Sequence, residues 1–272
     1  MSPTAFICRT CGVQHAPSEE PPDRCPICED ERQYVGWGGQ RWIALEEMAA
    51  KGYRNVVRDD HGLTGIGTEP SFGIGQRAVL VPTPGGNVMW DCISLIDDET
   101  VAAVEERGGL AAIAFSHPHF YGSMVEWSHA FGGVPLYVPE ADREWVMRDD
   151  TAIRTWSDRV DLAPGVTLIQ TGGHFEGSAV LHWDGGADGG GALLVGDTAT
   201  VVQDRRYVSF MRSYPNLIPL PQSSVAWIVE RLRPFAFDRI YGGWWSRVVE
   251  GGGKEALERS AERYVRYLRG RP

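Results

Sequence analysis

The chain has 272 residues, of which 43% are hydrophobic and 23% are charged, so it can bury a sizeable core and is neither disordered nor fibrous. With 36 acidic against 26 basic residues the formal net charge is −10, which argues against nucleic acid and an anionic membrane as partners. The longest uncharged run, residues 108–125, contains histidines, a proline and glycines and is therefore not a lipid-spanning helix. Residues 1–7 lack the basic and apolar regions of a signal peptide, so we expect a cytoplasmic protein.

Four of the five cysteines form two C-x-x-C units near the N-terminus, at Cys8, Cys11, Cys25 and Cys28. This spacing suits a tetrahedral thiolate site, because each pair can chelate one ion from a tight turn. The stretch between the pairs carries three prolines and few apolar residues, so a bound metal must supply its folding free energy. The alternative is four unrelated reduced thiols.

The C-x-x-C-G and C-P-x-C forms of these pairs resemble rubredoxin-like and zinc-ribbon knuckles. We therefore predict a small metal module over residues 1–36 and a second domain over residues 37–272. Zinc and iron both fit four thiolates, and a structural zinc is preferred over a one-electron iron site. The module is also a candidate surface for a homo-oligomer or a redox or protein partner.

Beyond the module, a short helix is predicted over residues 42–51 and a hairpin over 77–81 and 87–93. A helix capped by Asp98 follows, and then buried strands separated by turn signals. Amphipathic helices are predicted near residues 223–232 and 254–269. The strands lie at 111–115, 135–138, 166–169, 179–183, 192–195 and 239–241. Strands interrupted by helices indicate a layered α/β or α+β domain.

Side chains that can bind a metal follow three of these strands. His117 and His119 come after the strand at 111–115, His174 after that at 166–169, and Asp197 after that at 192–195. Loops at one edge of a sheet converge, so three imidazoles and one carboxylate from these loops form a set suited to zinc or ferrous iron. Each residue alone is more simply a loop histidine or a turn aspartate, and only their joint occurrence favours a metal site.

The segments H-x-H at His117, G-H-x-x-G-S around His174 and G-D-T around Asp197, with the final strand-G-G at residues 241–243, resemble the metallo-β-lactamase superfamily. The resemblance covers roughly the last 200 residues. It implies an αββα sandwich of class α+β, with His117, His119 and His174 in a first metal site and Asp197 bridging to a second.

The chain departs from the superfamily pattern at three positions of the second site. Tyr121 and Gly122 stand where the pattern H-x-H-x-D-H has its Asp and last His, and Trp244 stands where a final histidine is usual. The remaining set favours one metal ion, zinc or iron, over two.

The resemblance and the ligand set predict a metal-dependent hydrolase that acts on a small ester, thioester or lactone. A bound metal lowers the pKa of its water toward about 7, which supplies hydroxide at neutral pH. Asp197 is expected to orient that water or accept its proton, and Tyr121 to donate to an oxyanion. His61 and Trp244 are candidate substrate-binding residues, and Glu176 a carboxylate supporting His174. Two alternatives remain open: a mononuclear iron oxidoreductase of the same fold, and a catalytically silent metal-binding scaffold.

Overall fold

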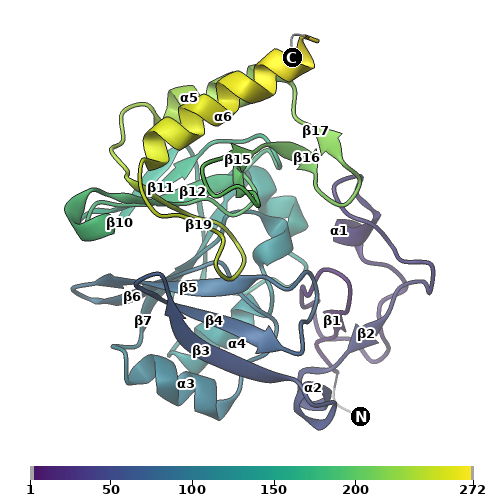
Figure 1. Ribbon diagram of the computed structural model, residues 1–272. Coiled ribbons are helices and arrows are strands. Elements are labelled where there is room, and N and C mark those ends of the chain that lie inside the picture. The colour runs from purple at the N-terminus through teal and green to yellow at the C-terminus, as the bar shows by residue number, and fades with distance from the viewer. Residues whose placement is uncertain (1–2, 271–272) are drawn as a thin grey trace.

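The computed structural model describes residues 3–270 and has two mixed β-sheets stacked face to face between helices (Figure 1). The seven-stranded sheet contains, in spatial order, β3 (Arg54–Asp60), β4 (Leu63–Glu69), β5 (Arg77–Thr83), β6 (Gly86–Trp90), β7 (Leu110–Ala114), β8 (Leu136–Pro139) and β9 (Ile153–Trp156). The six-stranded sheet contains β10 (Arg159–Ala163), β11 (Val166–Gln170), β12 (Ala179–Trp183), β13 (Ala192–Leu194), β18 (Arg239–Tyr241) and β19 (Val248–Val249). Three two-stranded sheets pair β1 (Ile7–Cys8) with β2 (Trp42–Ile43), β14 (Thr200–Val201) with β15 (Val208–Ser209), and β16 (Met211–Ser213) with β17 (Ile218–Pro219).

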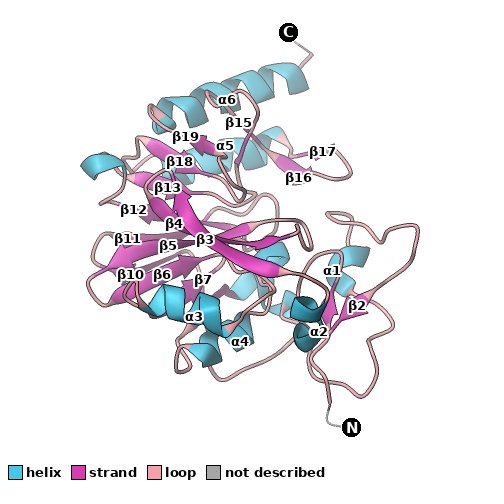
Figure 2. Ribbon diagram, turned by 60° about the horizontal axis from the view of Figure 1, so that its bottom comes forward, coloured by secondary structure: helices cyan, strands magenta, loops and turns pink. Residues whose placement is uncertain are grey.

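Helices cover the outer face of each sheet, as Figures 1 and 2 show. Helices α3 (Asp98–Glu105) and α4 (Met124–Ala130) lie on the seven-stranded sheet, and α5 (Gln222–Leu232) and α6 (Gly253–Leu268) on the six-stranded sheet. The short elements are α1 (Pro26–Glu29), α2 (Leu45–Ala50), η1 (Pro118–Phe120), η2 (Glu140–Trp145) and η3 (Ala187–Gly189). Helix α5 buries Val225, Ile228 and Leu232 at helical spacing, which is why it packs against the sheet. The predicted αββα sandwich is confirmed.

The predicted hairpin is present as antiparallel β5 and β6, and the two predicted C-terminal helices are present as α5 and α6. The helix predicted over residues 42–51 is wrong at its start, because Trp42–Ile43 pairs with Ile7–Cys8 as strand β2. The cap of α3 is Asp97 rather than Asp98, since Asp97 accepts from the backbone N–H of Thr100.

The N-terminal segment packs against the end of the sandwich, next to the β16–β17 hairpin (Figure 1). Contacts cross the predicted boundary at residue 36, since Arg9 N–H donates to the Arg41 carbonyl and the Gln40 amide donates to Cys8 Sγ. The four cysteines belong to the same apolar cluster as Ile93, Phe115 and Tyr121 of the sandwich. The domain boundary at residue 36 stays a prediction. Residues on both sides of it pack into the same apolar cluster.

Every helix in the described part of the chain is too short or too polar to span a lipid bilayer.

Candidate metal centres

Four side chains from three loops meet at one edge of the two sheets. His117 and His119 follow β7, His174 follows β11, and Asp197 follows β13. All four residues are at most 4% exposed, and their ligand atoms lie within 4.8 Å of one another. The structure therefore brings together the histidines and the aspartate that the strand ends predicted, from positions 80 residues apart in the sequence.

The spacing of these atoms suits a tetrahedral ion. Ligands about 2.1 Å from a tetrahedral metal lie about 3.4 Å apart. His119 Nδ1 lies 3.4 Å from His174 Nε2, and His117 Nε2 lies 3.5 Å from Asp197 Oδ2. His117 Nε2 and Asp197 Oδ1 have no hydrogen-bond partner within residues 3–270 although both atoms are buried. Buried atoms of this kind are ordinarily satisfied, so a cation fits the site.

Hydrogen bonds from the loops fix how the imidazoles point. His174 Nδ1 donates to the Met211 carbonyl at 3.2 Å, and His117 Nδ1 pairs with Ser116 Oγ at 2.9 Å. These bonds leave Nε2 of each ring free to face the centre of the cluster. Such partners select the tautomer of a metal-binding histidine and hold its ring in place.

Burial sets the charge of the cluster. It lowers the pKa of His174 to about 4 and lowers those of His117 and His119 well below their usual values, so the rings are neutral and their lone pairs free. Burial also raises the pKa of Asp197 to about 7. A bound cation would reverse that effect on Asp197, because opposite charge favours the carboxylate.

A pocket of ≈ 350 Å³ opens onto His119, His174 and Asp197. Its wall on the sandwich side includes Trp244, whose Nε1 donates to the Ile74 carbonyl at 3.0 Å. Its remaining wall includes a run from the N-terminal segment, Arg32, Gln33 and Tyr34, together with Thr10. The pocket is thus shared between the sandwich and the cysteine-bearing segment.

The four N-terminal cysteines form a second candidate centre. Cys8, Cys11, Cys25 and Cys28 are at most 1% exposed, and their Sγ atoms lie within 4.8 Å of one another. The closest contacts are 3.5 Å between Cys8 and Cys28 and 3.8 Å between Cys11 and Cys25. Thiolates 2.3 Å from a tetrahedral zinc lie about 3.8 Å apart, so the cluster fits such an ion.

Two of the residues predicted to act on or bind the substrate do not reach the pocket. Tyr121 is fully buried, packs edge-on against Phe115, and its hydroxyl has no hydrogen-bond partner in the described chain. It lines a small void beside Val13 instead, so the predicted oxyanion donor is corrected to a core residue. His61 lies in the β3–β4 turn, where its Nδ1 is 2.8 Å from Glu250 Oε1. It does not line the pocket, whereas Trp244 does.

The sequence analysis missed Asp91 and the Arg32–Tyr34 run. Asp91 is 1% exposed and its Oδ1 accepts from the backbone N–H of Ser116 at 2.7 Å, which fixes the turn leading into His117. Burial raises the pKa of Asp91 to about 8. The one available signal was a carboxylate inside the strand predicted over residues 87–93. Nothing in the sequence indicates that residues 32–34 lie beside His174.

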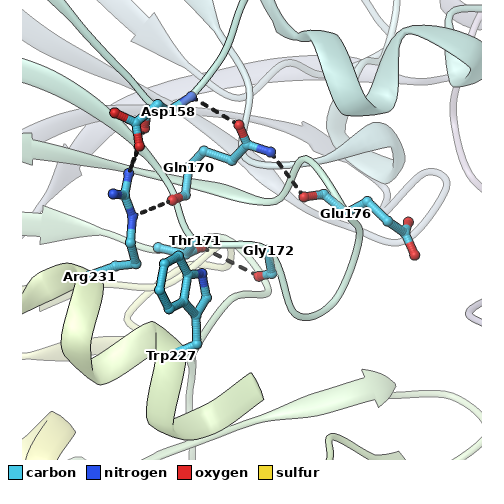
Figure 3. A pocket seen from close by; sticks show the side chains of 7 residues that line it. All are labelled: Asp158, Gln170, Thr171, Gly172, Glu176, Trp227 and Arg231. Atoms are coloured by element: carbon cyan, nitrogen blue, oxygen red, sulfur yellow. Dashed lines mark hydrogen bonds and ion pairs between the residues drawn. The ribbon is translucent and has the colours of Figure 1, made fainter. Parts of the chain in front are cut away.

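A second pocket, of ≈ 270 Å³, lies behind the His174 loop and is drawn in Figure 3. Its polar groups satisfy one another, since Arg231 pairs with Asp158 at 2.7 Å and Gln170 bonds to Asp158 and Glu176. Figure 3 shows the carboxylate of Glu176 pointing away from this pocket. The pocket is lined by none of the clustered metal-binding residues.

No protein family model matches the chain. The chain is 48% identical over 266 residues to the uncharacterized protein YmaE of Bacillus subtilis (strain 168), covering 97% of this chain and 96% of that protein.

Solved metallo-β-lactamases share the fold at low sequence identity. DIM-1 metallo-β-lactamase, in a structure exposed to ceftazidime, superposes with a TM-score of 0.57 at 14% identity, covering 79% of this chain and 98% of that one. SMB-1, in complex with mercaptoacetic acid, superposes with a TM-score of 0.52 at 17% identity, covering 77% of this chain and 92% of that one. A B3 metallo-β-lactamase with an active-site glutamic acid has a TM-score of 0.52 at 15% identity, covering 84% of this chain and 94% of that one. Together with the two clusters, these comparisons lead to one conclusion: the chain is a member of the YmaE family, built on the metallo-β-lactamase fold with an N-terminal four-cysteine module.

Proposed function

We propose that the chain is a metal-dependent hydrolase that acts on a small ester, thioester or lactone. The observation that carries the proposal is a pocket of ≈ 350 Å³ that opens onto His119, His174 and Asp197. With His117 these residues form a buried cluster of three neutral histidines and a carboxylate that has unpartnered atoms. Pockets of this size commonly take small molecules. His117, His119, His174 and Asp197 would hold the metal, which when bound polarises a carbonyl and lowers the pKa of water.

One metal ion at this site is favoured over two. Trp244 stands where the superfamily pattern has a further histidine, and its ring N–H is used by the Ile74 carbonyl. An indole N–H is a donor with no lone pair to offer a metal. Tyr121 faces the core rather than the pocket. Within residues 3–270 the clusters that can hold a metal are the four cysteines and the three histidines with Asp197.

The chain's own groups suggest how a substrate is bound and attacked. Asp197 Oδ1 is unpartnered and is therefore free to accept a proton from the attacking water. Gln33 is 5% exposed, lines the pocket, and its Oε1 has no partner in the described residues, so it can accept a hydrogen bond from a substrate N–H or O–H. Trp244 and Tyr34 also line the pocket and supply aromatic surface to it.

The test uses full-length protein purified without added metal. We expect two metal ions per chain, one for each cluster, and hydrolysis of 4-nitrophenyl acetate, a phenyl thioester or a simple lactone. His119→Ala should lose one metal ion and lower kcat/KM by at least about a hundredfold. The matched control is His129→Ala, an exposed histidine paired with Asp150, which should behave as the parent. Full metal loading without turnover of any of these esters would contradict the proposal.

The metal analysis also decides between zinc and iron. Zinc in both clusters supports the hydrolase. Iron at the histidine cluster would instead favour the oxidoreductase, with the four-cysteine cluster as its electron entry point. An empty histidine cluster beside a loaded cysteine cluster would favour the silent scaffold. We propose a cytoplasmic location, because a reducing compartment keeps the four clustered thiols available for metal.

A further inference from the structure

A single arginine joins the four-cysteine segment to the loop that carries His174. Arg32 is 3% exposed, and its Nε donates to the backbone carbonyl of His174 at 2.7 Å. Its Nη2 donates to both carboxylate oxygens of Glu176, at 2.9 and 3.0 Å, and its Nη1 to Asp30 Oδ1 at 3.0 Å. The guanidinium lies 4.1 Å from the centroid of the Phe175 ring. Three consecutive residues of the loop are therefore held by one side chain.

The charge and shape of arginine suit this position. A buried guanidinium is stable only where carboxylates and carbonyls satisfy its donors, and its planar fork can bind Glu176 with two bonds while Nε reaches a third acceptor. Lysine would place one compact charge there and could not span the same acceptors. The contacts thus specify arginine rather than any cation.

The position of Arg32 in the chain links the two centres. It follows the cysteine ligand Cys28 by four residues, and Asp30 between them accepts from the Arg32 backbone N–H as well as its side chain. On the far side, His174 is held through its ring by the Met211 carbonyl. A metal that fixes Cys28 therefore also fixes the arginine that holds His174.

We propose that Arg32 is a positioning residue that couples the four-cysteine cluster to the metal ligand His174. The inference rests on metal binding by the histidine cluster, which belongs to the proposed function. In a loaded protein, the ordered cysteine turn sets the position of Arg32, and Arg32 sets the backbone of His174 so that Nε2 faces His119 and Asp197.

Other bonds across the same junction separate this role from simple attachment. Ser213 Oγ donates to the Arg32 carbonyl, and the Asn216 amide donates to the carbonyls of Glu31 and Gln33. These bonds involve the backbone of the segment and remain when the Arg32 side chain is replaced. The segment should therefore stay docked in an Arg32 variant while the His174 loop loses its anchor.

Cobalt(II) is the probe, because thiolate ligation gives intense charge-transfer bands whereas nitrogen and oxygen ligation gives weak ligand-field bands. Full-length Arg32→Gln, loaded with cobalt and titrated with a competing chelator, should bind cobalt at the histidine cluster roughly ten- to a hundredfold more weakly than the parent. Its ligand-field bands should shift while its thiolate bands stay unchanged. Arg32→Lys should recover part of the loss. The control is Arg24→Gln, an exposed arginine of the same segment that should match the parent.

Cys28→Ser tests the link from the other end and should weaken cobalt at the histidine cluster in the same direction. Parent-like affinity in Arg32→Gln, or in Cys28→Ser, would overturn the coupling. Equal loss at both clusters in Arg32→Gln would also overturn it, since that result describes general unfolding. If Arg32→Gln does not fold, Arg32→Lys and Glu176→Gln carry the same comparison. No measurement here requires turnover, so cobalt coupling without ester hydrolysis would keep this inference and reject the hydrolase.

Discussion

Buried carboxyl groups stabilise the loops that carry the metal ligands. Asp91 holds the turn before His117, and Asp142 Oδ1 accepts from the Gly177 backbone N–H at 2.8 Å, just after the His174 loop. Both are at most 1% exposed. Each carboxyl group accepts a hydrogen bond from a backbone N–H that would otherwise have no partner. Because both groups are buried, their charged forms are costly in free energy. The loops thus depend on carboxyls that favour the protonated form.

Replacement of Asp142 tests this cost. Burial raises its pKa to about 7 in the folded chain, against 3.8 when unfolded, so the folded state binds the proton more tightly. The stability that Asp142 contributes is present below pH 4 and is lost as the pH rises to about 7. Asp142→Asn does not titrate. We expect the free energy of unfolding of the variant, relative to the parent, to rise across that window by up to about 4 kcal/mol and then level off.

Urea unfolding of both proteins at pH 5, 6, 7 and 8, under the same metal loading, measures this difference. Metal sites titrate equally in parent and variant and cancel in the comparison. A difference that does not change with pH would show that the Asp142 carboxyl ionises as readily in the folded chain as in the unfolded one.

At the scale of elements, the ends of the strands decide the geometry of the site. Gly196 lies two residues after β13 and has φ +48°, and a Cβ there would lie 2.2 Å from Ser116 Oγ. Ser116 in turn bonds to His117 Nδ1. The turn that delivers Asp197 therefore packs directly on the turn that delivers His117, and only glycine leaves room for both.

Gly196→Ala should displace Ser116 and weaken metal at the histidine cluster about tenfold or more. The matched control is Gly189→Ala, because Gly189 also has positive φ, +90°, but nothing lies within 4 Å of its Cβ position. Both variants carry the backbone strain, of order 1–3 kcal/mol, and only Gly196→Ala carries the clash. Metal content and thermal unfolding of the two variants separate these effects. Equal metal content would argue against contact between the two turns.

At the scale of the whole molecule, the four-cysteine cluster is part of the main core rather than an appendage. Its thiols share an apolar cluster with Ile93, Phe115 and Tyr121. The contact with Cys25, together with burial, raises the pKa of the Cys11 thiol. Four thiolates this close together and buried would repel one another, so the deprotonated cluster needs a cation. Metal binding contributes about 10–16 kcal/mol in small four-ligand modules, as much as a whole domain's stability.

Removal of that metal should therefore loosen one end of the sandwich. With a strong chelator, amide hydrogen exchange should rise over residues 4–43 and in the neighbouring residues 92–95 and 121–125, which contact the segment. Exchange in the six-stranded sheet should stay slow, because its core cluster contains none of the cysteines. Mass spectrometry of the exchanged protein measures both. Unchanged exchange over residues 4–43 would show that the segment folds without metal.

Local patterns in the sequence were enough to predict a layered α/β or α+β domain and the two ligand sets, and the resemblance to a known superfamily implied the αββα sandwich. C-x-x-C spacing, strands that end in histidine, and amphipathic helices are set by residues close together in the chain, and those patterns correspond to α5, α6, the β5–β6 hairpin and both clusters. The short strand β2 and strands β3, β4, β9 and β10 were missed, because mixed polar residues or distant partners define them.

Only the tertiary structure decided what surrounds the ligands. Tyr121 and Trp244 stand at positions of the same second-site pattern, yet one faces the core and the other lines the pocket, since packing rather than sequence spacing sets their direction. Arg32 reaches His174 across 142 residues because the cysteine turn docks on the loop. Sequence spacing specifies which atoms can bind a metal, because those residues follow strands and turns that form locally. Long-range packing determines which other side chains surround the metal-binding atoms.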